Sequence, residues 1–194
     1  MLARISSGAV LGIDAYAVQV EVDINFGMQV FHIVGLPKGA VREARLRIPA
    51  ALDNAGFEFP NSKITLNLAP ADIQKDGTAF DLPMAVGILA AQESIPARRE
   101  GFALEDYLIV GEMGLNGEVR PIEGALPLAV LARDTGLAGI ILPEANAREA
   151  AVVSGIEVLP VGHLTELTEF VQGRHPIEPE VTDYEAGEGV GSSY

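Results

Sequence analysis

The fold is decided by residues 64–91, which read Ile-Thr-Leu-Asn-Leu-Ala-Pro-Ala-Asp-Ile-Gln-Lys-Asp-Gly-Thr-Ala-Phe-Asp-Leu-Pro-Met-Ala-Val-Gly-Ile-Leu-Ala-Ala. Polar and apolar side chains alternate over 63–68, which predicts a strand with one buried face. Residues 81–92 are nearly all apolar and carry Pro83 where a first helical turn would be, so a helix buried on most sides is predicted. A polar turn therefore joins a half-buried strand to a core helix.

Two strands and a helix are predicted upstream of this stretch. Residues 17–24 alternate strictly between apolar and polar side chains, and 29–34 form a second, shorter β-rich run. Residues 38–56 have helical spacing, and Gly56 suits the C-terminal end of that helix. Pro49 lies inside the helix and is expected to bend or interrupt it.

Downstream, strands and helices alternate. Asn-Gly at 116–117 is a strong hairpin signal between strands at 106–112 and 118–120. Helices are predicted at 125–135, 144–152 and 164–172, and strands at 139–142 and 156–160. Because the hairpin and the alternating strands argue against a purely parallel sheet, the expected class is mixed α/β. Residues 1–173 are predicted to form one domain, and the acidic, aperiodic stretch 174–194 a disordered tail or linker.

Composition narrows the classes of function. The 194 residues include 13 basic and 27 acidic side chains, a net charge of −14, which predicts repulsion of duplex DNA outside any local basic patch. There is no cysteine, which excludes disulfides and thiolate metal sites. No apolar run approaches a membrane span, and the first residues lack the apolar stretch of a signal peptide. We therefore expect a cytoplasmic protein with no membrane partner.

Several catalytic motifs are missing. A P-loop needs Gly-Lys followed by Ser or Thr, but Lys38, Lys63 and Lys75 follow Pro, Ser and Gln, so no ATP site of that type is expected in this chain. The three histidines form no paired ligand set, and no metal site is expected. Neither a nucleophile-elbow motif nor a dinucleotide-binding glycine motif occurs.

Three stretches are more specific than any short motif. They are 31–60, which begins Phe-His-Ile-Val-Gly-Leu-Pro-Lys-Gly-Ala-Val-Arg-Glu-Ala-Arg, the run 64–91, and 111–124, which reads Gly-Glu-Met-Gly-Leu-Asn-Gly-Glu-Val-Arg-Pro-Ile-Glu-Gly. Together they resemble the N-terminal domain of the Mg-chelatase-related AAA+ proteins of the ComM/YifB family, over nearly all of residues 1–172. That domain resembles the Lon peptidase domain, which implies the fold of the second domain of ribosomal protein S5.

The resemblance to Lon invites a test of the catalytic positions. The Lon nucleophile lies in a Pro-Lys-Asp-Gly-Pro-Ser-Ala-Gly run, which residues 74–81 match with Ala79 at the serine position. The Lon lysine lies in a Pro-Ile-Gly-Gly-Leu-Lys run, which 121–126 match with Leu126 at the lysine position. Covalent cleavage needs a nucleophile and a base, and alanine and leucine supply neither. The resemblance therefore implies a proteolytically inactive domain without catalytic residues.

Two groups of residues remain candidates for binding. Lys75, Asp76 and Thr78 lie beside the lost nucleophile and either form a reused ligand or partner pocket or serve only as a turn and a helix start. Lys38, Arg42, Arg45 and Arg47 gather in one segment and either contact DNA phosphates or an acidic neighbouring subunit, or form a solvated helix face.

The family resemblance also implies partners. It implies a ring-forming ATPase acting on DNA in natural transformation and recombination, with this domain linked in cis to an AAA+ module that holds the ATP and Mg²⁺. The isolated domain is expected to be monomeric or weakly associating. The alternatives are a Lon-like peptidase with a non-standard nucleophile such as Thr78, a metal-handling chelatase subunit, and a DNA-binding accessory module.

Overall fold

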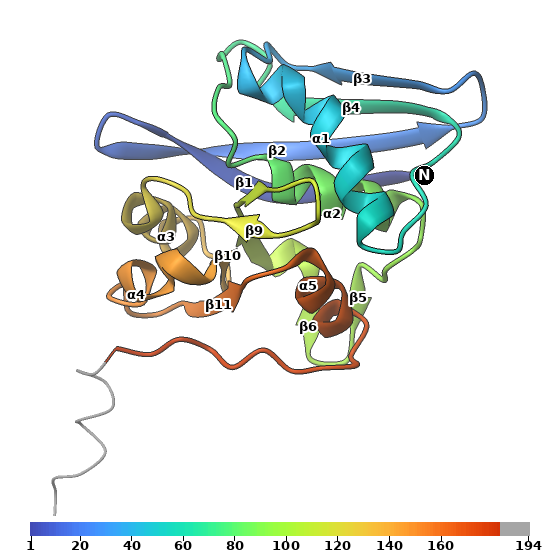
Figure 1. Cartoon of the computed structure of the whole chain (residues 1–194). Helices are drawn as coiled ribbons and strands as arrows, with labels where there is room; N and C mark the ends of the chain where they lie inside the picture. Colours follow the sequence, from blue (N-terminus) through green and yellow to red (C-terminus); the bar gives the residue numbers. More distant parts are fainter. Residues whose placement is uncertain (183–194) are drawn as a thin grey trace, which may run out of the picture.

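A seven-stranded mixed sheet forms the centre of the computed structural model, which describes residues 1–182 (Figure 1). The strand order is β11-β10-β7-β1-β2-β4-β3. The pairs β1–β2 and β2–β4 are antiparallel, whereas β3–β4, β1–β7, β7–β10 and β10–β11 are parallel. The strands of this sheet are β1 (Leu2–Leu11), β2 (Asp14–Asn25), β3 (Val30–Val34), β4 (Lys63–Ala69), β7 (Tyr107–Ile109), β10 (Gly139–Pro143) and β11 (Glu157–Val161).

Helices cover the sheet unevenly. The helices are α1 (Ala40–Asn54), α2 (Asp81–Ala91), α3 (Ala125–Asp134), α4 (Ala147–Ala150) and α5 (Leu164–Val171), with short 3₁₀ turns at Leu104–Asp106 and Glu144–Asn146. One core joins α1, α2 and α5 to one face of the sheet, and a second core joins α3 and α4 to the other face of β7, β10 and β11. Figure 1 shows α3 and α4 to the left of β10 and β11, with α2 to the right of these strands. One face of β2 and β4 carries polar side chains that are partly exposed to solvent.

The predicted core helix is confirmed as α2, whose eleven residues are all buried. Gly87 allows close contact with the sheet, because a Cβ there would lie 2.8 Å from Val22 Cγ2. The alternating runs become β2 and β4, with Val18, Val20 and Val22 of β2 buried. The sheet and the helix therefore meet where the apolar periodicity predicts.

Helix α1 is continuous across Pro49, so the predicted interruption does not occur. Its end follows the expected pattern: Gly56 has a φ of 88°, its N–H donates to Asp53 O, and Phe57 N–H donates to Leu52 O. Such paired bonds satisfy the last carbonyls of a helix. These hydrogen bonds therefore stabilise the C-terminal end of α1, although the helix contains a proline.

The remaining elements differ in detail from those predicted from the sequence. The predicted strand 106–112 is split: β7 joins the main sheet, whereas β8 (Glu112–Met113) pairs with β9 (Val119–Arg120) in the predicted hairpin. A second small hairpin pairs β5 (Arg98–Arg99) with β6 (Phe102–Ala103). The predicted helix 144–152 is a 3₁₀ turn followed by the single turn of α4.

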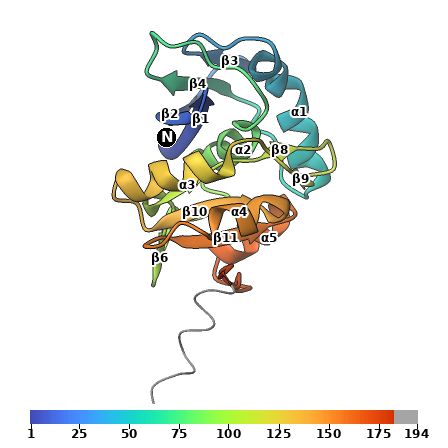
Figure 2. The same ribbon diagram turned by 90° about the vertical axis from the view of Figure 1, so that its left-hand side faces the viewer.

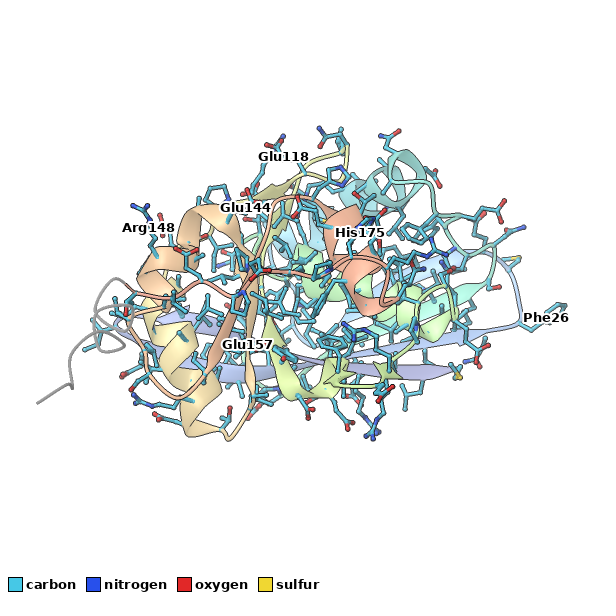
Figure 3. All side chains as sticks on the ribbon, turned by 90° about the horizontal axis from the view of Figure 1, so that it is seen from below. Phe26, Glu118, Glu144, Arg148, Glu157 and His175 are labelled. Carbon is cyan, nitrogen blue, oxygen red and sulfur yellow. The ribbon has the colours of Figure 1, made fainter. Side chains whose placement is uncertain are left out.

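The stretch 174–182, which the sequence places in the tail, lies against the domain. Ile177 packs on the core, and Glu180 N–H donates to Val158 O at 2.9 Å. The rest of the predicted disordered tail, 183–194, lies outside the described residues. Phe26 projects from the loop between β2 and β3 at one end of the molecule (Figure 3).

Candidate functional site

The loop between β4 and α2 carries the run that matches the Lon nucleophile, and Lys75 fixes it in place. The Lys75 side chain is fully buried, and its ammonium donates to Gly35 O at 2.9 Å and to Pro70 O. Its backbone pairs with the segment before α1, because Lys38 N–H donates to Lys75 O and Lys75 N–H to Leu36 O. Burial lowers the pKa of Lys75. The ammonium is therefore used in joining two loops of the protein.

The two other predicted pocket residues face outward or lie at the start of α2. Asp76 is exposed, and its Oδ1 accepts a hydrogen bond from Gly77 N–H at 2.7 Å. Thr78 is half-buried, and its carbonyl accepts from Asp81 N–H in the first turn of α2. These contacts fit a turn and a helix start. The structure thus brings Asp76 and Thr78 together with Lys75 on one loop, with the lysine directed inward.

Ala79 occupies the position where the comparison with Lon places the nucleophile. It is half-buried, and its carbonyl accepts a hydrogen bond from Gly111 N–H at 2.9 Å. A methyl side chain there can neither attack a carbonyl nor hold a proton. The backbone of the run is thus anchored beside the strand end after β7, without a reactive side chain at the nucleophile position.

A buried ion pair lies two residues further on, and it was missed by the sequence analysis. Asp81 is completely buried at the start of α2 and accepts two hydrogen bonds from Arg47 of α1, at 2.9 and 3.0 Å. It also accepts from Met113 N–H at 3.2 Å, and Arg47 donates in addition to Ala40 O at 2.7 Å. The pair thus joins α1, α2 and the β8–β9 hairpin.

The charges of this pair affect each other's protonation. Burial raises the pKa of the Asp81 carboxyl, and the Arg47 guanidinium opposes that rise. The hydrogen bonds to Asp81 raise the pKa of Arg47. We treat Asp81 as ionised at neutral pH, because a two-bond arginine contact and a backbone N–H both favour the carboxylate.

Arg47 therefore has a different role from the other three cations of the predicted basic segment. Its side chain is only 19% exposed and is committed to Asp81, whereas Lys38, Arg42 and Arg45 are exposed. Lys38 and Arg42 line an open depression of about 560 Å³ together with Val34, Leu36 and other residues before α1. Three cations of the segment are thus available to bind a partner, and they lie on one edge of the molecule.

Leu126, at the position of the Lon lysine, lies on the surface at the start of α3. Its side chain lines a groove of about 300 Å³ with Ile13, Asp14 and Val130, and its N–H donates to Glu149 Oε1 at 3.2 Å. Leucine offers no amine to accept a proton from a nucleophile. The position of the base has thus become part of an apolar surface.

The histidines have structural contacts or exposed positions. His163 caps α5 by accepting from Thr165 N–H at 3.1 Å, and its other ring nitrogen lies 2.9 Å from Asn116 O. His32 is exposed on β3, whereas its neighbours Phe31 and Ile33 are half-buried. Within residues 1–182 there is no cluster of three or more potential metal ligands, and no helix there is long and apolar enough to span a bilayer.

Comparisons with known proteins agree on one family. The model of the family described as subunit ChlI of Mg-chelatase matches residues 20–146. Escherichia coli YifB is 39% identical over 183 residues, and Haemophilus influenzae competence protein ComM is 38% identical over 182 residues. These matches cover 94% and 93% of this chain and 35% of each relative. The chain therefore spans about a third of the length of the relatives it matches.

A weaker match extends to peptidases. Lon protease of Azorhizobium caulinodans is 29% identical over 123 residues, which cover 61% of this chain and 14% of that protein. The mixed sheet with its covering helices, together with this match, places the chain in the class of Lon-like domains. Within that class, the chain belongs to the Mg-chelatase-related family that includes YifB and ComM.

Proposed function

We propose that this chain is a proteolytically inactive Lon-like module that acts by binding and assembly. The observation that carries the proposal is the pair of hydrocarbon side chains, Ala79 and Leu126, at the two positions where Lon has its serine and lysine. The loop around Ala79 is fixed by Lys75, and the next turn is filled by the Arg47–Asp81 pair. These contacts stabilise the scaffold without assembling a nucleophile and a base.

The module is proposed to serve a larger ATP-driven protein. The relatives are about three times as long as the part matched here, and this chain has no Gly-Lys-Ser or Gly-Lys-Thr sequence. ATP and Mg²⁺ are accordingly assigned to an AAA+ module linked in cis, and this chain to contacts with like subunits or with substrate. One relative is named as a competence protein, which supports a role in DNA uptake and recombination.

Incubation of the purified chain with casein tests the proposal. The expected result is no cleavage in excess of a buffer control, with wild-type protein and a Thr78→Ala variant giving equal backgrounds. Cleavage that continues over many turnovers and disappears in Thr78→Ala would instead establish a peptidase with a threonine nucleophile. Loss of a catalytic unit costs about 10⁶ in turnover in subtilisin, so the two outcomes are well separated.

The exposed cations at Lys38, Arg42 and Arg45 are the proposed contact surface. DNA phosphates and an acidic neighbouring subunit are the two proposed partners, because each would present negative charge to these cations. Binding to DNA would be steeply salt-dependent, because each phosphate contact releases a counterion. Fluorescence anisotropy with a duplex tests this: salt-sensitive binding abolished by Arg42→Glu with Arg45→Glu would favour DNA, whereas unaffected binding would exclude these arginines.

A further inference from the structure

The tip of the β1–β2 hairpin and the start of α3 together expose an apolar groove. The hairpin turns through only two residues, Gly12 with φ 66° and Ile13, whose side chain is 91% exposed. Leu11 beside it is 74% exposed, and Leu126 of α3 is 40% exposed. Val130 and Leu131 of α3 also line the groove. Such an arrangement leaves large apolar side chains in water, which is typical of a contact surface.

Acidic side chains surround this groove. Asp14 and Asp134 line it directly, and both are exposed. Glu149 reaches the groove edge, because its carboxylate accepts the N–H of Leu126. The nearest cation on α3, Arg133, is already held by Asp134 at 3.1 Å. A partner that fits the groove therefore presents apolar side chains flanked by positive charge.

The same chain carries a surface of that complementary kind, which we call the α1 face. It consists of the cations Lys38, Arg42 and Arg45 with the exposed apolar side chains Val34, Leu36 and Leu46. Leu46 is 73% exposed. Among residues 1–182, none of the three cations forms a salt bridge. In Figure 2, α1 and α3 lie on different sides of the molecule, so both surfaces are available at once.

We propose that the α1 face of one copy docks on the hairpin groove of a second copy. The inference rests on the proposed function, and it names the acidic neighbour that the α1 cations contact. An interface between two different surfaces of the same chain is heterologous, so repetition of it builds a ring or a filament. A net charge of −14 opposes the approach of DNA and also of a second copy, so the matched basic and acidic patches must outweigh that repulsion at close range.

The proposed contact also explains why leucine is suitable at position 126. A lysine at that position would place a cation in the groove that receives Lys38, Arg42 and Arg45 of the neighbour. Like charges brought together at an interface weaken it. The replacement of the base position by leucine thus removes the catalytic amine and makes the groove suitable for a basic partner.

Cysteine cross-linking tests the contact, because the natural chain has no cysteine. Two single-cysteine variants, Ile13→Cys and Leu46→Cys, are treated with a short bismaleimide separately and as an equimolar mixture. Both residues are exposed, so neither substitution disturbs the core. The expected result is dimers in the mixture and only background dimers in either variant alone. Phe26→Cys, which lies beyond the other end of β2 from Ile13, mixed with each of the two variants gives the matched control.

Charge reversal provides a second readout. Asp14→Lys with Asp134→Lys, added to the Ile13→Cys partner, should reduce the heterodimer to background. Adding Arg42→Glu with Arg45→Glu to the Leu46→Cys partner should restore it. Equal dimers in the mixture and in single variants, no dimers above the Phe26→Cys control, or loss without restoration would each overturn the proposal.

The outcomes also separate this contact from its alternatives. Duplex DNA that binds the wild-type chain through Arg42 and Arg45, together with no cross-link above the Phe26→Cys control, would assign the α1 face to DNA and overturn the contact between copies. Casein cleavage would contradict the proposed function and leave the cross-link result standing. Absence of the cross-link would contradict only the interface, because the lack of a nucleophile at Ala79 does not depend on it.

Discussion

At the scale of single residues, Arg47 and Asp81 show how a charge is kept in the core of this domain. The carboxylate is fully buried, yet each of its oxygens has a donor from Arg47, and Met113 N–H adds a third. Buried charges persist in proteins only where such partners compensate for lost hydration. The pair therefore ties α1 to the beginning of α2.

Replacing Arg47 by alanine should destabilise the protein strongly. The change leaves Asp81 buried without its charged partner, which typically costs about 3 kcal/mol. Urea unfolding at neutral pH measures the free energy of unfolding of the two proteins. Arg42→Ala is the matched control on the same helix, and because Arg42 is exposed it should change stability by less than about 0.5 kcal/mol.

The same variant predicts a pH effect with a definite sign. Burial raises the pKa of Asp81, and without Arg47 nothing of opposite charge counteracts it. A carboxyl whose folded-state pKa lies above its unfolded value favours the fold below the unfolded pKa and loses that contribution as pH rises through the folded pKa. The stability deficit of Arg47→Ala should thus shrink as pH falls from neutral toward 4. A deficit that stays constant or grows would contradict a buried, ionised Asp81.

This ion pair could not be predicted from sequence alone. Asp81 stands at the start of a predicted helix, where an acidic residue normally faces solvent and helps the helix dipole. Arg47 lies among other cations on a predicted surface helix. Only the packing of α1 across the start of α2, a contact between distant segments, shows that both side chains point inward.

At the scale of elements, Lys75 is the residue that holds two loops together. Lys75→Met keeps the length of the side chain but removes the donors to Gly35 O and Pro70 O. Leaving buried acceptors without donors should cost about 2 kcal/mol. Chemical denaturation should show this loss, whereas Lys63→Met, at an exposed site on β4, should be nearly neutral. If Lys75→Met leaves the stability unchanged, the fold does not need the Lys75 ammonium, and this result would favour a role in ligand binding instead.

The elements with clear periodicity were predicted well, and those defined by distant contacts were not. Strands β2 and β4 and helix α2 follow from alternation and from continuous apolar character. Strand β1 was missed because Ser7 and Gly8 break its pattern. Ser7 Oγ donates to Ile109 O, and a Cβ on Gly8 would lie 2.8 Å from Leu131 Cδ2. The contacts that require serine and glycine at these positions are thus made with residues far away in the sequence.

The candidate site shows the same division. Ala79 and Leu126 could be assigned from matched runs, because a lost nucleophile and a lost base are changes of residue type. The separate fates of Lys75 and Arg47, one buried against carbonyls and one against a carboxylate, depend on how loops and helices meet. The exposed groove beside Ile13 depends on a hairpin that the sequence analysis did not include.

At the scale of the whole molecule, charge and exposed apolar surface decide association. The proposed contact uses small surfaces, and small interfaces between proteins are weak. Light scattering after size exclusion should therefore give the mass of one chain at low concentration, rising as concentration increases and falling again in high salt. A stable hexamer that does not dissociate on dilution would contradict this expectation for the isolated chain.

The central claim, that the peptidase scaffold has no nucleophile, is tested most directly by covalent labelling. Intact-mass spectrometry of the folded chain after treatment with a fluorophosphonate reports any hydroxyl that a neighbouring base activates. The account predicts an unchanged mass. A stoichiometric adduct on Thr78, absent from the unfolded chain, would contradict it.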